Sequence, residues 1–244
     1  MNSIISQPRY LPVLNYLQRI HAADVFVFLD DVQRQGRGVE NRNKILFSGK
    51  ERWLTIPIGS SSREHIAASI ISGNDWVDQH IEIICLAYKK HPFFDAKIVY
   101  EIYESVQAIK GTPLMYVAVV EAFLTRVCTL FDLKFNFVKA SELDIDHTII
   151  GPQHLRDILV NIGADLYISG ANGANYGIED ELSGIIPVVY NVYTHRKYHQ
   201  YAQKDFVPWL SFFDALFNIG LEKTRDIIVS PLDLVSSTEM ARKV

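Results

Sequence analysis

Two neighbouring carboxylates, Asp30 and Asp31, follow an apolar run at residues 25–29 that predicts a β-strand. Acids at a strand end can hold a cation, accept hydrogen bonds from ribose hydroxyls or act as a general base. Side chains alternate along an extended chain, so at most one of the two should face a given ligand. We take Asp31 as a candidate catalytic base and Asp30 as a binding residue. The competing interpretation is that one acid caps a turn and the other is solvated.

A compact cluster of hydrogen-bond donors lies one loop further along the chain, at Asn41, Arg42, Asn43 and Lys44. Arg and Lys suit phosphate or carboxylate groups, and Asn side chains suit sugar hydroxyls or base edges. A charged loop before a strand is ordinarily only solvated. Its position close to the two acids favours a role in substrate binding.

A loop rich in small residues directly follows the strand predicted at residues 165–169. Such a loop lets backbone amides approach a ligand closely. No Gly-Lys-Ser/Thr follows it, and its glycine spacing is not that of a dinucleotide-binding loop. Ser169, Gly170 and Tyr176 are therefore candidate binding residues, with a plain turn as an equally good interpretation.

Two histidines, His195 and His199, stand four residues apart in a polar and aromatic run after another predicted strand. On a helix they would share a face and could bind zinc or transfer protons. The run lacks a helical pattern and a nearby acid, so we predict no metal. Both histidines are candidate catalytic bases, and Gln200 is a candidate binding residue.

The opening of the chain must position the two acids. Ile4 and Ile5 predict a strand, residues 13–20 carry apolar side chains at helical spacing, and residues 25–29 predict a second strand. Ligands of open α/β sheets lie outside the carboxyl ends of the strands. Polar side chains of the opening segment should gather at that edge beside the two acids: Gln7, Arg9, Tyr10 and Gln33.

Downstream, the pattern predicts a β-hairpin and then a helical insert. Residues 45–47 and 53–58 flank a short turn with a glycine. The insert, at about residues 76–131, should hold helices at 76–90, 95–109 and 112–131. Beyond it we predict strands at 135–138, 165–169 and 187–192, and helices at 152–162 and 206–219. The pattern indicates one α/β domain over residues 1–244, with a mostly parallel sheet, flanking helices, a hairpin after the second strand and a helical insert in the middle third.

Composition narrows the function. The formal net charge of −4 gives no overall basic field, so no stable nucleic-acid partner is expected. Cys85 and Cys128 are too few for a disulfide framework, fit a reducing cytoplasm and fall in helical runs as core residues. No signal peptide and no apolar run of about 20 residues is evident, so we expect a cytoplasmic protein without membrane insertion.

The order of these motifs resembles the WbqC-like protein family of bacterial polysaccharide gene clusters. The resemblance runs nearly end to end through segments at residues 7–12, 24–33, 41–45, 53–57, 167–170 and 206–218, and loosely at 198–200. Two departures stand out. Many members carry His before the Gln-Pro pair, where this chain has Ser6, and Trp-Leu-Gly-Tyr where it has residues 13–16. Ser6 excludes an imidazole base at that position.

The resemblance implies an enzyme of surface-polysaccharide (O-antigen, lipopolysaccharide) precursor synthesis. It would be an N-acyl- or N-aminoacyltransferase, for example a glycyltransferase, acting on the amine of a nucleotide-linked amino sugar. The resemblance leaves three acyl donors open: a coenzyme A thioester, a carrier-protein thioester and a charged RNA. It also leaves open whether the protein forms a homo-oligomer. Arg42 or Lys44 would then take the diphosphate, and Asp31, His195 or His199 the proton of the amine.

Two other classes of function stay open. A nucleotide-dependent ligase or adenylyltransferase would share the opening strand, loop and helix. Residues 6–9 lack both histidines of the His-x-Gly-His loop of such enzymes, which counts against it. The other is a non-catalytic sugar-binding module.

Overall fold

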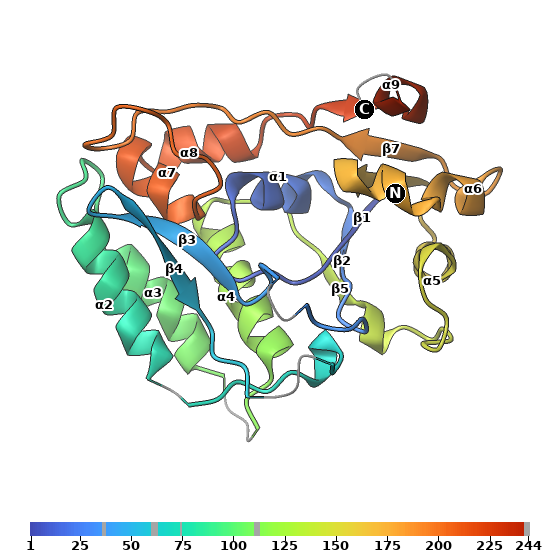
Figure 1. The fold of residues 1–244 in the computed structure, drawn as a ribbon, viewed down its shortest axis with the longest axis horizontal. Coiled ribbons are helices and arrows are strands. Elements are labelled where there is room, and N and C mark those ends of the chain that lie inside the picture. The colour runs from blue at the N-terminus through green and yellow to red at the C-terminus, as the bar shows by residue number, and fades with distance from the viewer. Residues whose placement is uncertain (36–37, 60–62, 74, 110–112, 242–244) are drawn as a thin grey trace.

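A parallel β-sheet organises the computed structural model, which describes residues 1–35, 38–59, 63–73, 75–109 and 113–241 (Figure 1). In this part of the chain the sheet has six strands in the order β5-β2-β1-β6-β7-β8. The strands are β1 (Asn2–Ser6), β2 (Val25–Phe28), β5 (Phe137–Lys139), β6 (Leu166–Gly170), β7 (Val188–Asn191) and β8 (Leu234–Val235). Only β8 runs antiparallel to its neighbour among them. The predicted mostly parallel α/β architecture is confirmed.

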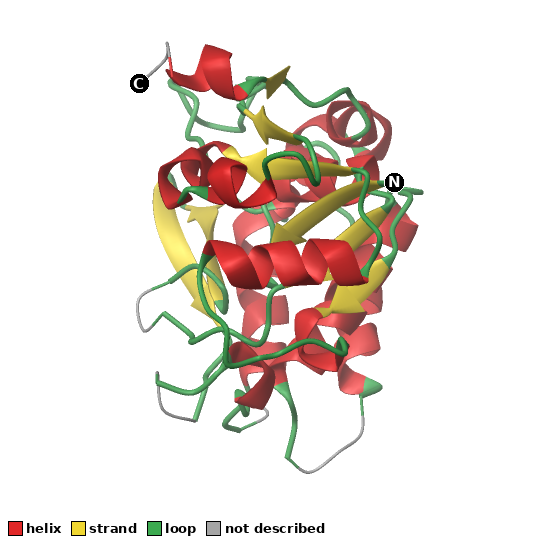
Figure 2. Cartoon of the chain, turned by 90° about the vertical axis from the view of Figure 1, so that its right-hand side faces the viewer, coloured by secondary structure: helices red, strands yellow, loops and turns green. Residues whose placement is uncertain are grey.

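Helices cover both faces of the sheet (Figure 2). On one face, α1 (Leu14–Ala22), α4 (Tyr116–Leu130), α7 (Phe212–Ile219) and α8 (Leu221–Ile228) belong to the larger apolar core. On the other, α5 (Pro152–Asn161) and α6 (Ile178–Leu182) pack in a smaller core. Ile4 belongs to the first core and Ile5 to the second, because successive side chains of a strand point to opposite faces.

The strand order changes direction at β1. The chain runs outward through β2 and β5 on one side of β1, then returns to β6 and β7 on the other. This is a doubly wound arrangement, in which ligands bind where the order reverses, outside the carboxyl ends of the strands.

A separate two-stranded sheet follows β2, as the sequence predicted, and consists of β3 (Arg42–Phe47) and β4 (Lys50–Thr55). Phe47 pairs with Lys50, so the turn consists of Ser48 and Gly49 alone. Both turn residues have positive φ, 50° and 75°, which a tight two-residue hairpin turn demands. Both strands begin earlier than predicted, β3 at residue 42 and not 45, and β4 at residue 50 and not 53.

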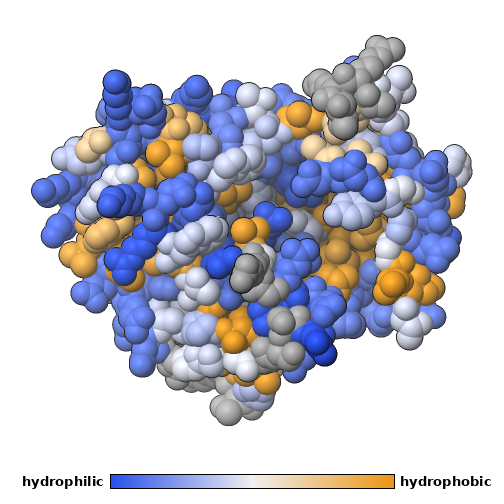
Figure 3. All heavy atoms as spheres, viewed as in Figure 1, coloured by the Kyte–Doolittle hydropathy of each residue, from blue (hydrophilic) through white to orange (hydrophobic). Residues whose placement is uncertain are grey.

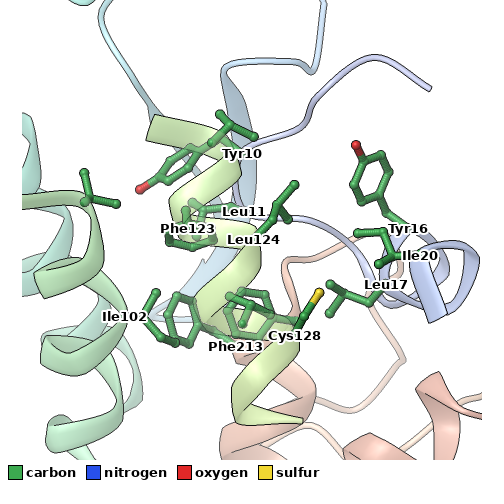
Figure 4. Close-up of a cluster of buried hydrophobic side chains, with 14 of the residues drawn as sticks. Tyr10, Leu11, Tyr16, Leu17, Ile20, Ile102, Phe123, Leu124, Cys128 and Phe213 are labelled. Carbon is green, nitrogen blue, oxygen red and sulfur yellow. The ribbon is translucent and has the colours of Figure 1, made fainter. Parts of the chain in front are cut away.

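The helical insert consists of α2 (Trp76–Tyr88), α3 (Ala96–Gln107) and α4. The helix predicted to open at Thr112 begins at Tyr116, and Thr112 itself lies outside the described residues. Aromatic and aliphatic side chains of α3, α4 and the segment before α1 pack together in the core (Figure 4).

Short elements complete the described chain: η1 (Ile66–Ala68), η2 (Ala140–Glu142), η3 (Ala171–Tyr176) and α9 (Ser237–Ala241). No helix within the described residues has the length and apolar character of a membrane span.

The helix predicted at residues 206–219 is shorter than expected, because α7 begins at Phe212. Pro208 disfavours helical geometry in the residue before it. Trp209 then adopts a φ of 61°, which a right-handed helix cannot contain. The six residues before α7 are therefore a loop, and Trp209 lies on it.

Candidate functional site

The two central strands separate at the point where the strand order reverses. β1 pairs with β6 at Asn2 and Ser3, and the pairing stops there, although β1 continues to Ser6. The carbonyl of Ile5, beyond the last pair, accepts a 3.4 Å hydrogen bond from Nη2 of Arg19 instead. A guanidinium from α1 thus lies against the opened edge of β1.

A cavity of about 330 Å³ lies between α1 and the β3–β4 hairpin. The face that carries both elements mixes hydrophilic and apolar side chains (Figure 3). One side of the cavity comes from the segment before α1 and from α1, and the other from the hairpin and the loop before α7. Its lining is Arg9, Tyr10, Pro12, Val13, Asn15, Tyr16, Arg19, Val39, Asn43, Lys44, Trp53 and Trp209.

Arg9 and Arg19 form what we call the arginine wall. The Arg9 guanidinium lies 5.8 Å from the centre of the Tyr16 ring, and the Nε atoms of both arginines are buried without a hydrogen-bond partner among the described residues. No carboxylate in that part of the chain forms an ion pair with either arginine. Burial lowers the pKa of Arg19, as does the neighbouring Arg9. Two half-buried guanidinium groups without a carboxylate partner favour a ligand that supplies the negative charge, so the wall is suited to an anion.

Trp53, Trp209 and Lys44 form the facing tryptophan wall. The Lys44 ammonium lies 5.7 Å from the Trp53 ring centre and 2.6 Å from Oε1 of Glu51. The two indoles are 45% and 47% exposed, which is unusual for side chains of this size. Lys44 is joined to the Trp209 loop through a bridge to Leu210 and through its carbonyl, which accepts a 2.9 Å hydrogen bond from the amide of Ser211.

Three residues of the predicted site, Tyr10, Asn43 and Lys44, line this cavity. The hydroxyl of Tyr10 is in the core, where it bonds Nδ1 of His80 at 2.7 Å and the hydroxyl of Tyr103; Figure 4 shows it pointing away from α1. Burial also lowers the pKa of His80 to about 4, so this histidine is neutral. The amide of Asn43 donates to the Leu11 carbonyl at 2.6 Å. Tyr10 and Asn43 thus shape the cavity, and Lys44 brings to it an ammonium that is paired with Glu51.

The other predicted binding residues of this region lie outside the lining. The amide of Asn41 donates to the carbonyl of Ile56 at 2.7 Å, and Arg42 lies over the ring of Trp53 at 4.8 Å. Gln7 accepts a 2.9 Å hydrogen bond from Tyr16 on its backbone carbonyl. Gln33 is exposed.

The residues predicted from the later loops separate into two groups. His195 is not part of the lining either, but it lies edge-on to the lining residue Trp209, with 4.2 Å between ring centres, at the border of the cavity. Burial lowers the pKa of His195, so its imidazole is neutral near pH 7. The remaining predicted residues do not line the cavity: Ser169, Gly170, Tyr176, His199 and Gln200. Ser169 and Gln200 are buried, whereas Tyr176 and His199 are exposed.

Asp30 and Asp31 contact the segment that follows β5. The Asp30 carboxylate accepts hydrogen bonds from the amide and hydroxyl of Ser141 at 2.9 and 2.7 Å. Oδ2 of Asp31 lies 2.8 Å from Nδ1 of His147 and 3.0 Å from Nε2 of His154. Burial raises the pKa of Asp30. Burial acts the same way on Asp31, but the imidazoles of His154 and His147 outweigh it and hold that pKa below its usual value.

The sequence did not predict the histidines that contact Asp31. His147 and His154 lie more than a hundred residues beyond Asp31, outside any strand-end loop that the pattern singled out. Arg19 and Trp209 were equally hidden, because their roles depend on how α1 and the loop before α7 meet the hairpin. Arg9 was placed at this edge of the sheet, but not among the binding residues.

The Asp31–His147 pair should make stability depend on pH. The Asp31 carboxylate raises the pKa of His147. The contribution of His147 is therefore full below about pH 6.5 and is lost as the pH rises through its raised folded value, while that of Asp31 is present above about pH 3.9. The His147 side chain is 37% exposed, so screening keeps the effect below about 1 kcal/mol.

Urea unfolding should show the wild type losing more stability between pH 6 and pH 8.5 than His147→Gln. An equal loss in both proteins would contradict the pairing, and His199→Gln is the control for removing an exposed imidazole.

Comparison with known proteins gives one family and a distant relative. The model of the WbqC-like protein family matches residues 7–226, which include both walls of the cavity. The chain is also similar to the uncharacterised protein Rv1507c of Mycobacterium tuberculosis, with 28% identity over 225 residues that cover 89% of this chain and 94% of the relative. No solved structure matches the chain.

Proposed function

The chain belongs to the WbqC-like protein family, and we propose that it is a transferase of surface-polysaccharide (O-antigen) precursor synthesis. In this proposal it moves an acyl or aminoacyl group, such as glycyl, onto the amine of a nucleotide-linked amino sugar. The family resemblance suggests the reaction class. The cavity between α1 and the hairpin supports the substrate class.

The single observation that carries the proposal is the arginine wall. Arg9 and Arg19 are half-buried at the opened edge of β1, with their Nε atoms buried, and neither has a carboxylate partner among the described residues. A nucleotide sugar contains a diphosphate, which is doubly charged and presents oxygens in the geometry that a guanidinium binds best. Lys44, whose ammonium pairs with Glu51, would add a hydrogen-bond donor from the opposite wall. An uncharged polysaccharide would leave the two arginines uncompensated, so the wall favours an activated sugar.

The chemistry needs a group that accepts a proton. The nitrogen of the amino sugar attacks the acyl carbon of the donor, a new C–N bond forms, and the bond from the acyl carbon to its thiol or hydroxyl leaving group breaks. The amine must give up a proton on the way, and a neutral imidazole is suited to take it. His195 has this property at the cavity border, because burial lowers its pKa. The carboxylate of Asp31 is already held by two imidazoles, which makes it the weaker candidate.

The experiment incubates the protein with a panel of nucleoside-diphosphate amino sugars and acyl donors, and follows the sugar by mass spectrometry. The donor panel should hold a coenzyme A thioester, a carrier-protein thioester and a charged RNA. The expected product is heavier than the sugar by one acyl group. If no sugar in a broad panel binds the protein or gains mass, the proposal fails.

His195 and His199 can be separated in the same assay. We expect His195→Gln to lower kcat by about 10²- to 10⁴-fold with little change in KM, because a general base acts in the transition state. His199→Gln should leave both constants unchanged, since His199 is exposed outside the lining of the cavity. The reverse pattern would remove His195 from the mechanism.

A further inference from the structure

The backbone of Trp209 is held in an unfavourable conformation. Its φ of 61° lies in the left-handed region, which residues other than glycine rarely adopt, and bulky residues least of all. Such strain is costly and persists only where the surroundings enforce it. The bridge from Leu210 to Lys44 and the hydrogen bond from the amide of Ser211 to the carbonyl of Lys44 fix the next two residues against the hairpin.

The strain does not serve to bury the indole. Trp209 stays 47% exposed and lines the cavity, whereas Trp76, the third tryptophan of the chain, is 5% exposed in the core. Trp209 touches His195 edge-on and Tyr193 at 5.9 Å between ring centres. Within the described residues no ring contact joins it to Trp53 across the tryptophan wall. The strained backbone therefore presents the Trp209 ring as an aromatic surface to the cavity.

The chemistry of the lining indicates what that surface receives. A sugar ring would need several carboxylates or amides for its hydroxyls, but the lining holds no acid and only two amides, Asn15 and Asn43, and that of Asn43 is already bonded to the Leu11 carbonyl. Asn15 is thus the one lining amide left for them. A planar, delocalised ring needs only a π-face, and bases stack on aromatic side chains without a fixed set of hydrogen bonds. The arginine wall lies across the same cavity, so a base on Trp209 can be joined to phosphates on Arg9 and Arg19.

We propose that Trp209 is the stacking residue for the nucleobase of the substrate, so that the base, and not the amino sugar, occupies the tryptophan wall. This rests on the proposed function, because it uses the same cavity. It adds an orientation: the base lies on the hairpin side and the diphosphate on the α1 side. Selectivity for a nucleotide over a plain sugar phosphate then comes from Trp209.

Calorimetric titration of the full chain tests this with four probes: uridine diphosphate, adenosine diphosphate, ribose 5-phosphate and inorganic pyrophosphate. The wild type should bind both nucleotides more tightly than ribose 5-phosphate and pyrophosphate. Trp209→Ala should weaken nucleotide binding about 10- to 100-fold, as stacking of one base predicts, and leave pyrophosphate binding unchanged. Trp209→Phe keeps a ring and should recover part of the loss. Tyr100→Ala, which removes an aromatic that is 52% exposed on α3, is the matched control.

Trp209→Gly separates a stacking role from a structural one. Glycine adopts the left-handed backbone without strain, so this variant should melt no lower than Trp209→Ala while losing the same nucleotide affinity. If Trp209→Ala weakens pyrophosphate and nucleotides equally, Trp209 merely supports the cavity and the inference is overturned. If the wild type binds pyrophosphate through Arg9 and Arg19 but prefers no nucleotide, the inference falls and the anion site stands. If nothing binds, the proposed function falls as well.

Discussion

Replacing the two arginines together, Arg9→Met with Arg19→Met, should abolish binding of pyrophosphate and of nucleoside diphosphates. A hydrogen bond to a charged group contributes about 1.5–3 kcal/mol, so two of them account for roughly a 100-fold to 10,000-fold loss. Binding should be measured by calorimetry at low salt, because screening weakens such contacts.

The same double variant should be at least as stable as the wild type. Methionine fills a similar volume with apolar atoms, and it removes the desolvation cost of a half-buried charge that has no ion-pair partner among the described residues. A protein that gains thermal stability and loses its ligand has a binding site at that position. Arg126→Met is the matched control, because Arg126 pairs with Glu101 between α4 and α3, away from the cavity. It should keep full affinity. Unchanged pyrophosphate binding in the double variant would contradict the arginine wall.

The second large effect is expected at Asp214, which is fully buried on α7. Its Oδ2 accepts hydrogen bonds from Nε2 of Gln200 at 2.7 Å and from the hydroxyl of Tyr198 at 2.8 Å, and Oδ1 lies 3.4 Å from the hydroxyl of Tyr88. Burial raises the pKa of Asp214, and these three donors oppose that rise. The carboxylate thus ties α7 to α2 and to the segment that leads to the Trp209 loop.

Asp214→Ala should cost about 3–5 kcal/mol of unfolding free energy, because it strands several buried polar groups at once. Asp214→Asn keeps one acceptor oxygen and should cost less. Urea unfolding gives both values, and Asp205→Asn, an exposed acid on the same segment, should change little. The alanine variant should also weaken nucleotide binding, because Trp209 follows this segment. Equal midpoints for Asp214→Ala and the wild type would show that the network does not hold the loop.

The regular elements near the start of the chain could be predicted because their signals are local. Leu14, Leu17 and Ile20 repeat at the period of a helix, and residues 25–28 form a short apolar run, so α1 and β2 appear where expected. The end of the chain was harder. Apolar side chains at residues 206–219 fit one helix, but Pro208 and the backbone of Trp209 prevent a helix before Phe212, where α7 begins.

The candidate site was predictable only in its position along the sheet. Residue type indicated the strand ends, and Lys44 does line the cavity. Which side chain reaches the cavity is a tertiary property. Asp30 reads as a free acid in sequence, yet it binds Ser141, and Tyr10 reads as a polar aromatic, yet its hydroxyl lies in the core. Arg19 is an ordinary surface-helix residue in sequence until α1 packs against the opened edge of β1.

The most direct test of the cavity as the substrate site is a crystal structure of the protein with a nucleoside-diphosphate amino sugar. We expect phosphate oxygens within hydrogen-bond distance of both Arg9 and Arg19, and the base stacked on Trp209. A ligand bound elsewhere, for example beside Asp31 and His147, with the arginine wall unchanged, would contradict the account.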